Sequence, residues 1–186
     1  TKENLLYAGT ETGLYISING GKSWETFQLN LPIVPITDLT IRNNNLIAST
    51  QGRSFWILDD LTMIHQYKPN DMKKDFHLFT PRTTFRTSGG NEESKLVGQN
   101  PPTGVVLQYH IAHEIEKESI VKMEFLDDNE NIIRTITNQK SKSAKTFGGS
   151  YNPVKIPAKK GMNRFVWNFR IDDIKLVPDV SFFGGY

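Results

Sequence analysis

The sequence of 186 residues contains no cysteine, and this absence excludes a disulfide framework and thiolate chemistry. It leaves the redox compartment open, because many bacterial periplasmic and secreted proteins also lack cysteine. No apolar run approaches the roughly 18 residues of a membrane-spanning helix. The first residues also lack the apolar core of a signal peptide. The sequence therefore predicts no membrane span.

A strong charge of either sign is missing as well. Twenty-two Lys and Arg residues stand against 20 Asp and Glu residues, which gives a formal net charge of +2. The basic residues are spread along the chain without a cluster. We therefore expect neither nucleic acid nor an anionic membrane among the partners.

The chain also lacks helix-length amphipathic windows, and the best helical candidate, residues 59–66, is at most two turns long. Short β-branched or aromatic runs alternate instead with Gly, Asn and Pro, as in an all-β sandwich, barrel or propeller. We expect strands at 5–8, 13–18, 24–29, 36–41, 45–50, 54–58, 104–111, 119–126, 132–136 and 164–170, with 76–79 as a strand or connector.

Composition changes between residues 67 and 103, where Pro, Ser, Gly, Asn and Glu accumulate. We therefore predict a first segment over 1–66, a connecting segment over 67–103 and a second β segment over 104–186. Residues 127–131 predict a hairpin turn. The Ser-, Lys- and Gly-rich stretch 140–152 predicts a flexible or disordered loop.

Residues 17–24, Ser-Ile-Asn-Gly-Gly-Lys-Ser-Trp, are the stretch most suggestive of chemistry. A phosphate cradle needs a helix after the glycines, but the residues after Trp24 predict a strand. A nucleophilic Ser17 needs a nearby histidine base, and the nearest in sequence is His65, with no elbow motif around the serine. A hairpin turn is the remaining interpretation.

Local chemistry favours that turn. Asn19, Gly20 and Gly21 can adopt the left-handed conformations of a tight hairpin. The side chains of Ser17 and Asn19 can bond to loop amides, and Trp24 can cover the turn with its apolar face. We therefore expect residues 19–21 to reverse the chain between two strands.

The same stretch resembles the Asp-box, Ser-x-Asp-x-Gly-x-Thr-Trp, of β-propellers in sialidases, sortilin-like receptors and related secreted repeat proteins. Ser17, Gly21 and Trp24 match the motif, Ser23 stands for Thr, and Asn19 replaces the Asp. In that family the box folds a hairpin on the rim, away from the ligand face. The resemblance therefore implies a structural role for these five residues.

The resemblance extends along the chain. Residues 6–17, 36–39 and 49–60 look like the closing blades of bacterial sortilin-like BNR-repeat proteins, which are often labelled glycosyl hydrolases. In those proteins an immunoglobulin-like sandwich follows the propeller, and residues 119–137 and 161–170 resemble it, although Asn168 departs from the usual Asp. The resemblance implies an all-β fold, with a partial β-propeller of one to two blades before an immunoglobulin-like β-sandwich.

This family resemblance implies the C-terminal portion of a longer secreted, periplasmic or cell-envelope protein, with a sandwich truncated after residues 182–186. The implied role is non-catalytic, with the remainder of the propeller or another chain as partner, a protein, peptide or glycan as ligand, and no cofactor. The alternative is the terminal piece of a BNR-type glycoside hydrolase whose catalytic carboxylates lie upstream. A hydrolase active in this chain needs two carboxylates on one face, whereas the acidic residues here fall mostly in predicted turns.

Arg53 is the candidate ligand-binding residue, because it follows Gly52 and precedes an aromatic run, where it can meet an anionic ligand or carboxylate. An internal hydrogen-bonding role is the alternative. The adjacent Asp59 and Asp60 favour turn or cap roles over catalysis, since strand neighbours point to opposite faces.

His110 and His113 have a spacing that suits a metal on a helix, but a strand places them on opposite faces, so no metal site is predicted. Trp56 and Trp167 favour core anchors over sugar platforms. The acidic residues 127–130 lack the pattern of a calcium loop and favour a solvated hairpin tip.

Overall fold

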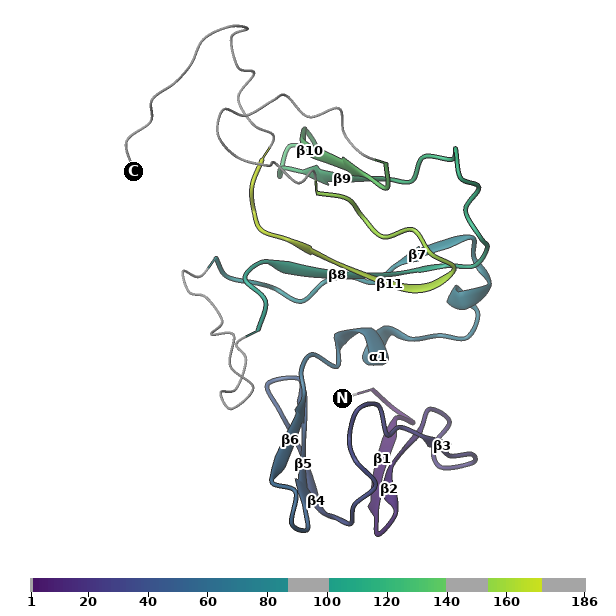
Figure 1. The fold of residues 1–186 in the computed structure, drawn as a ribbon, viewed down its shortest axis with the longest axis vertical. Coiled ribbons are helices and arrows are strands. Elements are labelled where there is room, and N and C mark those ends of the chain that lie inside the picture. The colour runs from purple at the N-terminus through teal and green to yellow at the C-terminus, as the bar shows by residue number, and fades with distance from the viewer. Residues whose placement is uncertain (1, 87–100, 140–153, 172–186) are drawn as a thin grey trace, which may run out of the picture. The chain divides into compact units, whose positions relative to one another are not determined.

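The computed structural model describes residues 2–86, 101–139 and 154–171, which divide into two compact units (Figure 1). Unit 1 comprises residues 2–69, 79–83 and 101, and unit 2 comprises 70–78, 84–86, 102–139 and 154–171. Antiparallel β-sheet dominates the regular structure of both units, which confirms the all-β prediction at the level of fold class. No helix within these residues is long and apolar enough to cross a membrane.

Unit 1 contains two three-stranded antiparallel sheets, each built from consecutive strands. The first sheet consists of β1 (Leu6–Thr10), β2 (Gly13–Ser17) and β3 (Glu25–Thr26). The second consists of β4 (Ile36–Arg42), β5 (Asn45–Thr50) and β6 (Phe55–Leu58), and helix α1 (Thr62–Gln66) follows it. The β-branched and aromatic runs of the sequence therefore form strands, as predicted.

Both sheets of unit 1 contribute to one hydrophobic core. In β5 the two-residue alternation turns Leu46 and Ala48 inward, opposite Leu58 and Trp56 of β6. Leu46 packs in a cluster that also contains Leu14, Leu31 and the fully buried Leu61. Each such leucine contributes about 1.5–3 kcal/mol by leaving water.

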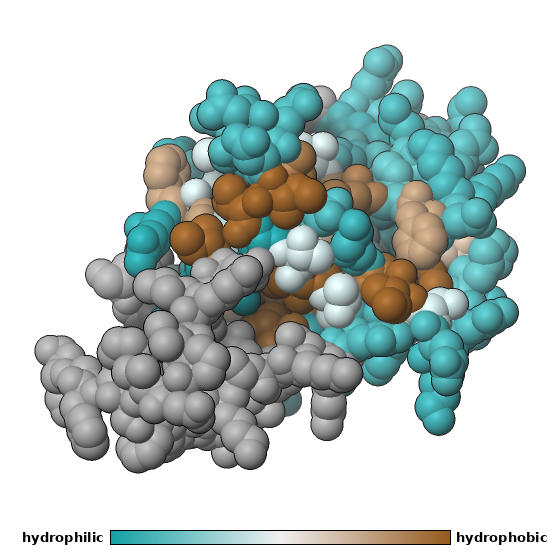
Figure 2. Space-filling view, turned by 90° about the horizontal axis from the view of Figure 1, so that it is seen from above, coloured by the Kyte–Doolittle hydropathy of each residue, from teal (hydrophilic) through white to brown (hydrophobic). Residues whose placement is uncertain are grey.

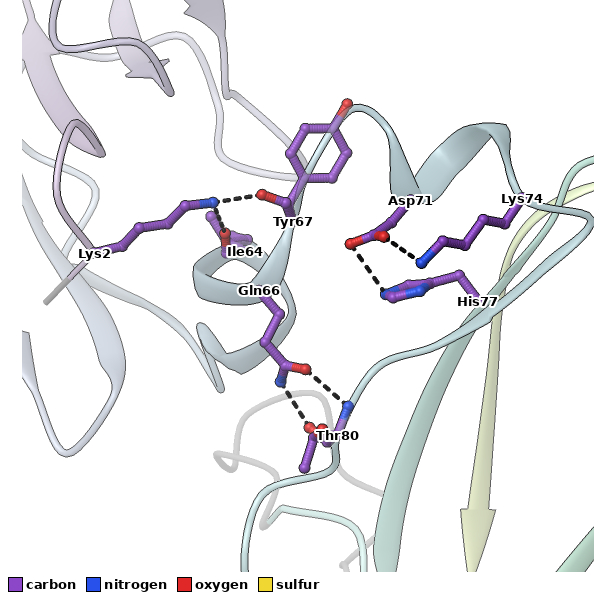
Figure 3. A network of polar contacts seen from close by, with 8 residues as sticks. All are labelled: Lys2, Ile64, Gln66, Tyr67, Asp71, Lys74, His77 and Thr80. Carbon is purple, nitrogen blue, oxygen red and sulfur yellow. Dashed lines mark hydrogen bonds and ion pairs between the residues drawn. The ribbon is translucent and has the colours of Figure 1, made fainter.

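Helix α1 is too short to be stable in isolation, so contacts within unit 1 hold it. Lys2 Nζ donates hydrogen bonds to the carbonyl oxygens of Ile64 and Tyr67 at the end of the helix (Figure 3). Partial burial lowers the pKa of the Lys2 ammonium group. The Gln66 amide exchanges two hydrogen bonds with the backbone of Thr80, at 2.8 and 2.9 Å.

Unit 2 is built from two small sheets that share a core. The order of the first is β11-β8-β7, formed by β7 (Phe76–Leu78), β8 (Val105–Ile111) and β11 (Gly161–Trp167), and the short 3-10 helix η1 (Asp71–Lys73) precedes β7. The second pairs β9 (Lys122–Leu126) with β10 (Ile132–Thr137). Alternate residues of β8, β10 and β11 fill the core with Leu107, Tyr109, Ile111, Ile136, Phe165 and the nearby Ile156.

Several predicted strand bounds are wrong. The run 24–29 forms a strand only at Glu25–Thr26; the Gln28 side chain bonds to the Leu14 N–H and to its own loop, and Leu29 takes a left-handed backbone conformation with φ of 47°, which a strand does not accommodate. The run 119–126 begins its strand at Lys122, since the Val121 amide donates instead to Asn138 Oδ1. The last strand spans 161–167 rather than 164–170.

Three further predictions concern the connecting segment 67–103, the loop 140–152 and the truncation near 182–186. Within the predicted connecting segment 67–103, residues 76–78 form strand β7 of unit 2. The predicted loop 140–152 and the predicted truncation near 182–186 lie outside the described residues.

Hydrophobic side chains reach the surface of both units. Figure 2 shows hydrophobic patches set among hydrophilic residues in the view from above. Exposed large apolar side chains include Phe55, Ile57 and Ile33 in unit 1 and Phe85, Ile120 and Ile171 in unit 2. Of these residues, Phe55 and Ile57 lie on the same strand, β6.

Candidate functional site

The stretch 17–24 is a hairpin turn, as predicted. Strands β2 and β3 pair antiparallel on either side of it, and no helix follows the glycines. Ser17, only 1% exposed, accepts the Gly21 N–H at 2.9 Å and donates to Asn19 Oδ1 at 3.0 Å. Asn19 Oδ1 also accepts the Ser23 N–H at 3.0 Å, while Asn19 Nδ2 donates to Ser23 Oγ at 2.8 Å.

Glycine conformation and an indole complete this turn. Gly20 and Gly21 have φ values of 72° and 87°, the left-handed region that favours glycine. A Cβ on Gly21 would lie 3.5 Å from Leu6 Cδ1 and 3.9 Å from the ring of Trp24, so the indole borders the bend. The five positions that resemble an Asp-box therefore lie within one turn, where their polar atoms bond to one another and to the backbone.

Arg53 lies in the loop that joins β5 to β6. Two side-chain donors bond to backbone carbonyls of this loop: Thr50 Oγ1 donates to Ser54 O at 2.6 Å, and Trp56 Nε1 donates to Arg53 O at 2.8 Å. The Arg53 side chain is exposed, and among the described residues its guanidinium has no hydrogen-bonded or ionic partner. Its positive charge is therefore available to a ligand at the start of β6.

An apolar pocket opens beside β6 within unit 1. Strands β2, β5 and β6 and the segment 27–31 line it, with Leu14, Phe27, Leu46, Trp56 and Leu58 among the lining residues. Apart from Gln28 and Asn30, the lining residues are apolar or aromatic. A pocket of this kind accepts an apolar side chain more readily than a polar ligand.

The side chain of Gln28 holds one side of this pocket in place. Its Nε2 donates to the carbonyl oxygens of Leu31 and Pro32 at 2.9 and 2.7 Å, and its Oε1 accepts the Leu14 N–H at 3.1 Å. A Cβ on Gly13, whose φ is 134°, would lie 2.0 Å from Gln28 Oε1, so only glycine leaves room for this amide. The amide thereby fixes the segment 28–32 against β2.

Leu29 stands at the lip of the pocket. It is a leucine in the left-handed region, with φ of 47°, and its side chain is largely exposed. A left-handed non-glycine residue costs roughly 1–3 kcal/mol and often marks a functional segment. The Gln28 hydrogen bonds on either side of this residue hold it in place.

Strand β6 is an open edge. It pairs with β5 on one side, and no described strand pairs with its other side. Trp56 and Leu58 turn toward the core, whereas Phe55 and Ile57 turn outward and are 74% and 59% exposed. Edge strands are usually protected by Lys, Pro or a bulge, and β6 carries none of these. The edge is therefore suited to pair with another strand.

The adjacent carboxylates have structural roles. Asp60 Oδ1 accepts the Thr62 N–H at 3.0 Å in the turn before α1 and Asn44 Nδ2 at 3.2 Å, so of the turn or cap roles predicted for it Asp60 has the turn role. Asp59 is exposed at the end of β6. The geometry therefore brings no pair of carboxylates together at this point.

The two histidines of the His-x-x-His pattern have different surroundings. His110 is half-buried in β8, whereas His113 lies beyond the strand end, where Nε2 is 3.1 Å from Asp75 Oδ1. No group of three His, Cys, Asp or Glu side chains in residues 2–86, 101–139 and 154–171 is arranged to hold a metal ion. Nothing in the sequence singles out His77, which pairs across the sheet with His110, because only strand register brings these two residues together.

The remaining candidates of the sequence have structural roles. Trp56 packs against the core of unit 1, and Trp167 stacks on Phe125 with ring centroids 4.2 Å apart, so both are core anchors as predicted. Asp127 accepts the Asn131 side-chain amide at 3.0 Å and the backbone N–H groups of Asn129 and Asn131. These hydrogen bonds, the Asn131 side chain foremost, lower the pKa of Asp127 at an exposed hairpin tip.

The chain matches no family model, no curated protein and no solved structure. The candidate site is therefore defined by geometry. It consists of the open edge of β6, the apolar pocket beside it and the exposed guanidinium of Arg53, all within unit 1.

Proposed function

We propose that this chain is a non-catalytic scaffolding and binding portion of a sortilin-like β-propeller protein. In this proposal the two sheets of unit 1 belong to the propeller, and the two-sheet core of unit 2 is an immunoglobulin-like sandwich. The hairpin turn of residues 17–24, which resembles an Asp-box in sequence and is held by hydrogen bonds, supports the first assignment. A secreted, periplasmic or cell-envelope location belongs to the same proposal and rests on the family resemblance.

The edge of β6 carries the proposal of binding. An extended protein segment can add to an open edge through main-chain hydrogen bonds, while pockets for alternate side chains supply specificity. Strand β6 offers both elements, because residues 56–58 line the adjacent pocket and the exposed Phe55 and Ile57 present an apolar outer face. The partner is therefore a strand from the remainder of the propeller or from another protein chain.

The chemistry of the pocket favours a peptide over a glycan. Sugar recognition requires several polar groups that converge on hydroxyls, but the amide of Gln28 is already engaged in three hydrogen bonds to the backbone. The pocket instead presents Leu14, Phe27 and Trp56 to an entering side chain. Arg53 adds a positive charge near the start of β6, which suits a peptide with an acidic residue at that end. The glycoside hydrolase alternative has no specific observation in its favour among the described residues.

A phage-displayed library of random octapeptides, panned against the full chain, tests this proposal. We expect selected peptides with apolar residues at alternate positions and NMR shifts confined to β6 and the pocket. Ile57→Lys should weaken their binding at least about tenfold, since central apolar anchors of interfaces are worth about 1–2 kcal/mol or more. Ile33→Lys is the control, because Ile33 is an isoleucine of unit 1 that lies outside β6 and is 82% exposed, compared with 59% for Ile57. Equal losses in the two variants, or peptide-induced shifts elsewhere in the chain, would refute the proposal.

A further inference from the structure

One face of the main sheet of unit 2 carries, in a single row, three side chains of types that can ligate a metal ion. Met162 of β11 pairs in register with His110 of β8, and His110 pairs in turn with His77 of β7. Residues in register across a sheet share a face, and their Cβ atoms are about 4.5–5.5 Å apart. The core residues Tyr109 and Ile111 alternate with His110, so the row lies on the face opposite the core.

The central histidine of the row has an unused nitrogen. The Nδ1 atom of His110 is buried and has no hydrogen-bond partner among the described residues. An unpaired buried polar atom is costly in a folded protein and calls for an explanation such as a bound ion. On either side of it, Met162 is 47% exposed and the His77 side chain retains some contact with solvent. An ion from solution can therefore reach the row.

The carboxylate of Asp71 lies near His77, at one end of the row. Asp71 Oδ2 is 3.9 Å from His77 Nε2, and Asp71 Oδ1 is 2.7 Å from Lys74 Nζ (Figure 3). A carboxylate beside an imidazole orients the ring of a metal-ligating histidine. The nearby Lys74 ammonium and the Arg164 guanidinium, two residues from Met162 on the same face, disfavour a divalent cation more than a monovalent one.

We propose that His77, His110 and Met162 form a binding site for Cu(I). A thioether with two imidazoles is a soft donor set, and methionine sulfur selects Cu(I) over the harder divalent ions. The single charge of Cu(I) suits a sheet face that carries Arg164 and lies near the Lys74 ammonium group. The inference rests on residues of unit 2 alone, so it stands independently of the function proposed for β6.

Anaerobic titration of the untagged full chain with Cu(I), in competition with bicinchoninate, tests this site. We expect one Cu(I) per chain and sulfur scattering in the copper X-ray absorption spectrum. Because even outer-shell partners are worth about 10- to 100-fold in metal affinity, Met162→Leu should weaken Cu(I) binding at least tenfold and remove the sulfur signal. The variant conserves size at a half-exposed position, and its NMR spectrum verifies that the fold is retained.

Two matched variants serve as controls. Met123→Leu changes a methionine of β9 that packs on the core, and His113→Gln changes an exposed histidine outside the row. Neither should alter Cu(I) affinity, whereas His110→Gln should abolish stoichiometric binding. The proposal is overturned if the chain binds no Cu(I), if sulfur scattering survives Met162→Leu, or if Zn(II) binds as tightly and Met162→Leu leaves both affinities unchanged.

Discussion

Replacement of Ser17 by alanine tests the turn on which the first sheet of unit 1 depends. Ser17 is buried at 1% exposure, and its hydroxyl makes two short hydrogen bonds, as acceptor from the Gly21 N–H and as donor to Asn19 Oδ1, besides a long one of 3.5 Å from the Asn19 N–H. Alanine removes both bonds and leaves a partly buried N–H without a partner. We therefore expect Ser17→Ala to destabilise unit 1.

The magnitude follows from these two bonds. An unsatisfied N–H costs about 1–3 kcal/mol when buried, and a hydrogen bond to a more exposed side chain is worth about 0.5–1.5 kcal/mol. Because the Gly21 amide is only partly buried, the lower part of each range applies, and the expected loss is about 2 kcal/mol. For a unit of this size, that loss lowers the melting temperature by about 8–16 °C.

Ser23→Ala is the matched control, since Ser23 lies in the same turn but is exposed. Its expected cost is within about 0.5 kcal/mol, as for other surface substitutions. Urea denaturation followed through NMR amide signals of unit 1 measures both variants, and hydrogen exchange at the Gly21 amide reports the turn directly. If the two alanine variants lose equal stability, or if the Gly21 amide exchanges as slowly in Ser17→Ala as in the parent chain, the hydrogen-bonded turn is not what holds this hairpin.

Three further predictions concern single contacts. Gly13→Ala should destabilise unit 1 by about 1–3 kcal/mol in urea melts, because φ is 134° and the new Cβ would lie 2.0 Å from Gln28 Oε1; unchanged stability would contradict this account. Tyr7→Phe should be neutral or stabilising, since the buried Tyr7 hydroxyl has no partner among the described residues. Tyr109→Phe, by contrast, removes a hydrogen bond to a backbone carbonyl and should cost about 1 kcal/mol. If thermal melts show Tyr7→Phe to be the more destabilising variant, these hydrogen-bonding roles of the two hydroxyls are wrong. The pKa of Asp127 is lowered in the folded chain, so the carboxylate stabilises unit 2 above the unfolded pKa of 3.8, and this stabilisation is lost as the pH falls through the folded pKa. Asp127→Asn should remove this dependence of stability on pH, which an acid titration followed through the NMR signals of the hairpin amides can measure.

Burial also sets the behaviour of the chain in alkali. It raises the pKa of Tyr7 and of Tyr109 to about 12. A raised folded pKa gives stability that is present below the unfolded value of 10 and is lost as the pH rises toward 12. Each unit contains one of these tyrosines.

Local features of the sequence determined the class of this protein and its main turn. Two-residue alternation marks a strand wherever it lies, and Asn19, Gly20 and Gly21 favour a left-handed bend whatever surrounds them. Strand positions and the hairpin were therefore predictable, and so was the turn role of Asp60. Where a strand bound was wrong, as at Leu29, a tertiary contact had overridden the local pattern.

Tertiary structure alone decided the two sites proposed for this chain. The pocket beside β6 exists because the Gln28 amide bonds to Leu14 and to its own loop, and nothing in the spacing of the sequence reveals that bond. The row of His77, His110 and Met162 likewise depends on register between strands that are far apart in the chain. Alternation shows that a strand has two faces, but only strand pairing determines which distant residues share one of them.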